Sequence, residues 1–138
     1  MTTPRLGPAL ALFLTLSGAG LARAEPSYRL SQAPLVSAKA GVVAATTVEV
    51  KPGPGYHFNK DYPTSLKLDP NAEVDAPAKL TAKDAGVKVA EEGASFEVKL
   101  TPKSPGKKAV TGLLSFAVCT ASTCVPTREK VTLNLDVK

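Results

Sequence analysis

The sequence predicts an all-β domain, an antiparallel sandwich of about seven strands. Three observations lead to it: short stretches of alternating apolar and polar residues, prolines and glycines between those stretches, and no helical periodicity beyond residue 24. Alternation with a period of two places the apolar side chains on one face of a sheet. Frequent turn signals between short strands are typical of a sandwich, and a small closed barrel is the alternative arrangement of the same strands.

The first elements follow residue 24. Residues 25–40 are expected to form a loosely structured lead-in to the sandwich. Residues 42–50, VVAATTVEV, are rich in β-branched side chains and predict a strand. Residues 51–55, KPGPG, predict a turn, because proline cannot continue a central strand and glycine accepts turn conformations.

Short strands and then two long ones are predicted in the rest of the chain. The clearest alternation places Ala94, Phe96, Val98 and Leu100 on one face, with Ser95, Glu97 and Lys99 on the other. Prolines and glycines separate the strands from one another. The predicted ranges are 65–68, 87–89, 94–100, roughly 109–119 and 124–137.

The amino terminus has the layout of a secretory signal peptide. Arg5 precedes an apolar run over residues 8–16, and the small residues around Ala24 follow it. The apolar run is too short to span a bilayer as a helix. We therefore expect residues 1–24 to be removed and residues 25–138 to form one periplasmic or secreted domain with no membrane span.

Composition argues against several classes of binding protein. Without Arg5 and Arg23, 15 of the 17 basic residues remain against 12 acidic ones, a net charge of +3. The lysines are scattered and tryptophan is absent, so no nucleic-acid partner is expected. His57 is the only histidine and the mature chain has no methionine, so neither a metal nor another cofactor is expected.

Cys119 and Cys124 are the only cysteines, and an exported chain can oxidise such a pair. If they face each other across a hairpin, residues whose numbers sum to 243 become cross-strand partners, and their apolar faces agree. Directly opposed Cα atoms lie ~4.5–5.5 Å apart, within the range that a disulfide bridges. Strand parity then places both cysteines on the polar, outward face.

Two functions remain open for this pair. Closing a loop of six residues stabilises a fold by only ~2 kcal/mol, which favours a disulfide that exchanges with thiols over a structural one. The alternative is a non-catalytic exported sandwich that binds a partner and keeps a structural hairpin disulfide.

Two segments resemble the amino-terminal periplasmic domain of the thiol:disulfide interchange reductase DsbD. The first is Leu114–Leu135, in which a strand enters a C-x4-C loop with Pro126 two residues beyond the second cysteine. The second is the glycine-aromatic turn at residues 55–60, GYHFNK, followed by the short strand at 65–68. The stretch in which that family carries an aromatic cap loop, between Pro77 and Gly93, contains no aromatic residue here.

The resemblance implies an immunoglobulin-like fold and a redox-active pair, Cys119 and Cys124, as the catalytic residues. It implies that Tyr56, Phe58 and Pro126 are neighbours of the site. The expected activity is the relay of reducing equivalents, by mixed disulfides, to a periplasmic thioredoxin-like protein or a membrane electron conduit. The resemblance favours Cys124 as the attacked sulfur, and it leaves the direction of electron flow open.

The export signal gives the first prediction. Mass spectrometry of the exported protein should find Glu25 at its amino terminus, because the small residues around Ala24 form the expected cleavage site. An intact Met1 on a cytoplasmic product would contradict both the compartment and the redox argument.

Overall fold

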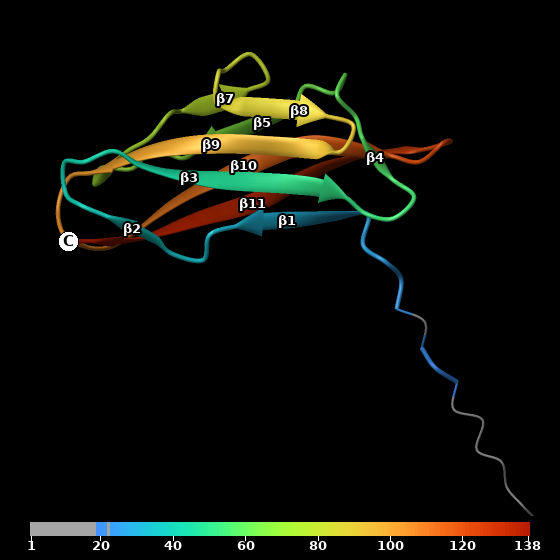
Figure 1. Ribbon diagram of the computed structural model, residues 1–138, viewed down its shortest axis with the longest axis horizontal. Coiled ribbons are helices and arrows are strands. Elements are labelled where there is room, and N and C mark those ends of the chain that lie inside the picture. Colours follow the sequence, from blue (N-terminus) through green and yellow to red (C-terminus); the bar gives the residue numbers. More distant parts are fainter. Residues whose placement is uncertain (1–18, 22) are drawn as a thin grey trace, which may run out of the picture.

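A computed structural model describes residues 19–21 and 23–138, so nearly all of the expected signal peptide lies outside the described residues. The described chain is an all-β, immunoglobulin-like sandwich of two sheets (Figure 1). Within these ranges no helix is long and apolar enough to cross a membrane.

In the described residues, eleven strands build the two sheets, and seven of them have four residues or more, in line with the predicted number. In chain order they are β1 (Tyr28–Gln32), β2 (Val36–Ala38), β3 (Ala44–Pro52), β4 (His57–Phe58), β5 (Ser65–Leu68), β6 (Val74–Asp75), β7 (Lys79–Thr81), β8 (Val87–Ala90), β9 (Gly93–Pro102), β10 (Gly106–Cys119) and β11 (Cys124–Val137).

One sheet has the order β1-β3-β9-β6, with β8 also pairing with β9. The other has the order β2-β11-β10-β5-β7, with β4 also pairing with β10. Every pairing is antiparallel except that of β2 with the end of β11. The central strand β10 therefore has β11 along one edge and both β4 and β5 along the other.

Alternating side chains of both sheets fill the space between them. In β9 the four apolar residues from Ala94 to Leu100 are buried, as the alternation predicts. Three phenylalanines, Phe58, Phe96 and Phe116, are fully buried, and each contributes roughly 1.5–3 kcal/mol relative to an exposed side chain. Phe58 and Phe116 stack with ring centroids 6.0 Å apart, which ties β4 to the core side of β10.

The expectation of a loosely structured lead-in at residues 25–40 is wrong, because this segment contains β1 and β2. Strand β1 pairs with β3 from Tyr28↔Pro52 to Gln32↔Val48, and Tyr28 and Leu30 pack against the core. Strand β2 adds to the end of β11 in parallel. Pairing with strands farther along the chain orders this segment, so its own sequence does not show that it forms two strands.

A turn follows β3 as predicted, but it begins later than residue 51, because Lys51 and Pro52 still belong to β3 and pair with β1. It is a type II turn over residues 53–56. The Tyr56 N–H donates to the Gly53 carbonyl at 3.0 Å, with Pro54 and Gly55 as the central residues. Gly55 has a φ of 78°, which this turn type requires and which glycine adopts without steric cost. The turn reverses the chain after β3 and delivers β4 to the edge of β10.

Tyr28 joins the two sheets at the side of the sandwich. Its ring meets Phe116 edge-on with centroids 4.9 Å apart, and its hydroxyl donates to the Glu129 carboxylate on β11. That hydrogen bond, with burial and the negative charge of Glu129, raises the pKa of Tyr28 to about 12. The phenol thus stays protonated in the folded state at pH values where an unfolded tyrosine ionises.

This contact predicts a specific alkaline loss of stability. Because the folded pKa is raised from 10.0 to about 12, the stabilisation is complete below about pH 10 and is lost as the pH rises through about 12. The fall in the free energy of unfolding between about pH 9 and about pH 11 should be smaller in Tyr28→Phe than in Tyr62→Phe, measured by urea unfolding. Equal falls in the two variants would contradict this role of Tyr28.

Candidate functional site

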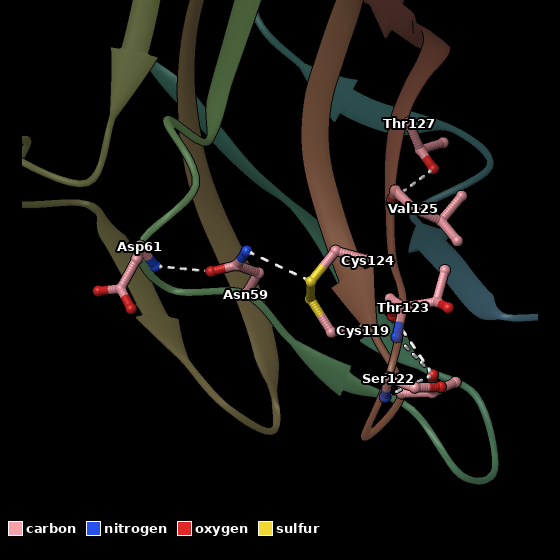
Figure 2. The surroundings of a disulfide bond; sticks show 9 residues. Asn59, Asp61, Cys119, Ser122, Thr123, Cys124, Val125 and Thr127 are labelled. Carbon is pink, nitrogen blue, oxygen red and sulfur yellow. Dashed lines mark hydrogen bonds between the residues drawn. A yellow bond between two sulfur atoms is a disulfide. The ribbon is translucent and has the colours of Figure 1, made fainter.

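The two cysteines form a disulfide at the end of the β10–β11 hairpin (Figure 2). The sulfurs are 2.05 Å apart, and the bond joins residues only five positions apart in the chain. Neither cysteine is free, so the structure holds the oxidised form of the pair. A disulfide at this predicted position is thereby confirmed.

The hairpin register is the predicted one at every pair. β10 and β11 pair from Gly106↔Val137 to Cys119↔Cys124, and each pair of residue numbers sums to 243. Beyond the cysteines, the Thr120 N–H donates to the Thr123 carbonyl at 2.7 Å, and the Thr120 hydroxyl accepts from the Thr123 N–H at 3.1 Å. These bonds close the loop tightly over Ala121 and Ser122.

The hydrogen bond at Thr120 and Thr123 also sets the spacing of the cysteines. Antiparallel pairs alternate between hydrogen-bonded and non-hydrogen-bonded types, so Cys119 and Cys124 occupy the adjacent, narrower non-hydrogen-bonded type. Their Cα atoms are 4.0 Å apart, closer than expected from the sequence. Side chains of such a pair lie on the same face of the sheet, where the two sulfurs can bond.

The two cysteine residues differ in their exposure. Both cysteines lie on the outward face by strand parity, and Cys119 is absent from the buried cluster between the sheets. A position on the outward face does not make both residues accessible, because Cys119 is only 3% exposed while Cys124 is exposed. One residue of the disulfide is therefore accessible to another protein and the other is largely covered.

Position within the sheet explains this difference. Cys119 sits in a strand paired on both sides, with Cys124 on one edge and His57 of β4 on the other. Among the described residues, no second strand flanks β11 at Cys124, because β2 pairs with β11 only at Leu135–Val137. The asymmetry follows from β4, which covers only one flank of the hairpin end.

Asn59 completes the surroundings of the disulfide (Figure 2). Its backbone N–H donates to the Ala117 carbonyl at 2.9 Å, which extends the pairing of β4 with β10 by one residue. Its side-chain Nδ2 lies 3.9 Å from Cys124 Sγ, and its Oδ1 accepts from the Asp61 N–H at 3.0 Å. A residue 65 positions earlier in the chain thus contacts the sulfur of the exposed cysteine.

The expected neighbours of the site take different positions. Phe58 pairs with Val118, beside the cysteine, but its side chain is fully buried in the core. Tyr56 is half-buried and packs against that core. Pro126 is exposed on β11, two residues from Cys124 and on the same face. Of these three, only Pro126 shares the outward face of the disulfide.

Two further polar residues, His57 and Asn59, lie next to the disulfide. His57 is exposed and stands directly opposite Cys119 in the β4–β10 pairing. Asn59 was not predicted as a site residue, and the only signal for it was its place in the glycine-aromatic turn. In the part of the chain that the structure describes, no three histidine, cysteine or acidic side chains gather as a metal site requires.

Comparison with known proteins yields no family. No protein-family model matches the chain, and no curated protein matches it either. The major subunit of aggregative adherence fimbriae type I from Escherichia coli is 10% identical with a TM-score of 0.46, over 84% of this chain and 97% of that one. The CooA pilin subunit from enterotoxigenic Escherichia coli is 10% identical with a TM-score of 0.30, over 82% and 99% respectively.

The structure therefore defines a β-sandwich domain with one hairpin disulfide on its outward face.

We expect the fold to survive loss of that bond, because the pairing of β10 with β11 continues over all the residues beyond it. Cys119→Ala combined with Cys124→Ala should lower the free energy of unfolding by about 2 kcal/mol while unfolding stays cooperative. Urea unfolding followed by circular dichroism measures this, and a double variant without a cooperative transition would favour a structural role for the bond.

Proposed function

We propose that this chain is a periplasmic or secreted thiol–disulfide exchange protein that relays reducing equivalents to a partner through Cys119 and Cys124. The observation that supports it most is the unequal exposure of the pair: Cys124 is exposed, and Cys119 is 3% exposed. A disulfide that exchanges with another protein needs one accessible sulfur, and a second thiol held nearby. A staple made only for stability gains more by closing a longer loop.

The exchange proceeds in two steps through a mixed disulfide. A thiolate of a donor dithiol attacks Cys124 Sγ, the bond to Cys119 breaks, and Cys119 leaves as a thiolate. The second thiolate of the donor then attacks the donor's own sulfur in the mixed disulfide and releases Cys124 as a thiolate. The donor ends as a disulfide, Cys119 and Cys124 end as thiols, and two electrons and two protons have been transferred.

The reverse sequence passes the same electrons onward. Reduced Cys124 attacks a disulfide of the acceptor, and Cys119, held opposite it in the hairpin register, resolves the mixed disulfide. The resemblance to the amino-terminal domain of DsbD supports this relay and the class of partner, a thioredoxin-like protein or a membrane electron conduit. On this proposal, residues 1–24 direct export and residues 25–138 are the working domain.

The second candidate is a non-catalytic exported sandwich that binds a partner and keeps a structural disulfide. The observation in its favour is that the bond joins the ends of the two longest strands, each of 14 residues, with Cys119 buried. In that position the disulfide can hold the hairpin end closed without ever exchanging. The two candidates differ in whether a partner thiol ever bonds to Cys124.

Single cysteine variants distinguish the two functions. Cys119→Ala leaves the exposed Cys124 as a free thiol with no resolving partner, so it should accumulate a mixed disulfide with a thioredoxin-like protein of the same compartment. Cys124→Ala leaves only Cys119, which β4 flanks, and should accumulate far less of the same complex. Non-reducing electrophoresis with mass spectrometry of the captured band measures both, and the band should vanish on reduction.

The reduction potential provides an independent measurement. Equilibration with glutathione buffers should give a potential above about −300 mV, the value below which structural disulfides resist reduction. A potential well below that value, with no captured partner in either variant, would leave the non-catalytic module as the function.

A further inference from the structure

We propose that Asn59 is a further catalytic residue of this site: its side-chain amide donates a hydrogen bond to Cys124 Sγ and stabilises the Cys124 thiolate. The inference rests on the proposed exchange function and names the group that tunes its reactive sulfur. Nδ2 of Asn59 lies 3.9 Å from Cys124 Sγ in the oxidised form (Figure 2). A neutral sulfur is a weak acceptor, whereas a thiolate attracts the same N–H much more strongly.

The orientation of the Asn59 amide is determined by its other hydrogen bond. Oδ1 accepts from the Asp61 N–H at 3.0 Å, which identifies the oxygen and leaves the NH₂ group directed at the sulfur. This Asx turn is reinforced by the Tyr62 N–H, which donates to the Asn59 carbonyl at 3.3 Å. The donor is therefore in place before any charge develops on the sulfur.

The backbone of this segment is anchored on both sides. The Asn59 N–H is bonded to Ala117 on β10, and the preceding Phe58 N–H donates to the Glu91 carbonyl at 2.8 Å. The Phe58 side chain is locked in the core by its contact with Phe116. Because the segment is held at each of these points, the amide donor contributes without an entropic cost of ordering at the moment of reaction.

Charged and titratable groups also lie on the two segments that flank the disulfide. On the segment that carries Asn59, His57 stands opposite Cys119, Lys60 pairs with Glu91 at 3.6 Å, and Asp61 is exposed. On β11, Arg128 is four residues from Cys124, ~13 Å along an extended strand. Glu129 is engaged by the Tyr28 hydroxyl. The group in hydrogen-bond contact with Cys124 Sγ is the side-chain amide of Asn59.

The hydrogen bond assists both directions of exchange. When the donor resolves the mixed disulfide, Cys124 is the leaving thiolate, and a more stable thiolate leaves faster. When reduced Cys124 attacks an acceptor disulfide, the same bond raises the fraction present as thiolate. In each case the charge appears on the sulfur that Asn59 contacts, and no proton needs to pass through the amide.

The test measures the pKa of one thiol in the exported protein carrying Cys119→Ala. The rate of alkylation of Cys124 by iodoacetamide is followed against pH, and the midpoint of the profile gives the pKa. Adding Asn59→Ala should raise that midpoint by about half a unit or more, because the donor to the thiolate is lost. Adding Asn59→Asp should raise it at least as far, because it retains an acceptor for the Asp61 N–H but replaces the donor by a negative charge.

Asn71 offers a matched control. It forms the same kind of turn, accepting from the Glu73 and Val74 N–H groups at 2.9 and 3.1 Å, but its Nδ2 donates to the Ala109 carbonyl. Asn71→Ala should therefore lower thermal stability without moving the midpoint for Cys124. A general structural effect of losing an asparagine turn would shift the midpoint in both the Asn59 and Asn71 variants.

The outcomes separate this inference from the proposed function. An unchanged midpoint in Asn59→Asp, with its unfolding temperature preserved, would overturn the role of Asn59 even if Cys119→Ala still captures a partner. A raised midpoint with no captured partner would support the hydrogen bond and count against the exchange function. Neither result depends on knowing the identity of the partner.

Discussion

Fourteen consecutive residue pairs join β10 to β11, and this antiparallel ladder is the constraint on which the rest of the structure depends. A shift of one residue would turn the apolar face of each strand away from the core, so burial of residues such as Leu114 and Leu133 strongly selects the register. The same register places Cys119 opposite Cys124 as a narrow pair. The disulfide therefore follows from a ladder that the core stabilises. The bond itself contributes little to the stability of the fold.

The reactivity proposed for the disulfide comes from the neighbours of the hairpin. On one side, β4 pairs with β10 and leaves Cys119 buried, whereas on the other side β11 has no partner strand near Cys124 within residues 19–21 and 23–138. A disulfide in the middle of a sheet would be closed to partners, and one on a free hairpin would expose both sulfurs. The short strand β4 creates the intermediate case, in which Cys124 is exposed and Cys119 is buried.

The type II turn after β3 links these features. Gly55 lets the chain reverse sharply, Phe58 inserts into the core, and Asn59 emerges on the outward face beside the disulfide. Successive side chains of an extended segment point in opposite directions, so Phe58 lies on the core face and Asn59 on the outward face. Core packing of an apolar residue fixes the position of the polar residue that follows it.

The sequence by itself determined the all-β class, the strands β3, β5, β8, β9, β10 and β11, and the cysteine register, because alternation and local turns carry that information in neighbouring residues. Only the tertiary structure decided that residues 28–32 form an edge strand, that Cys119 is buried, that Phe58 turns into the core and that Asn59 meets Cys124. Each of these depends on a pairing between segments far apart in the chain. Strand parity gives the face on which a side chain lies, but its exposure depends on which other strand packs beside it.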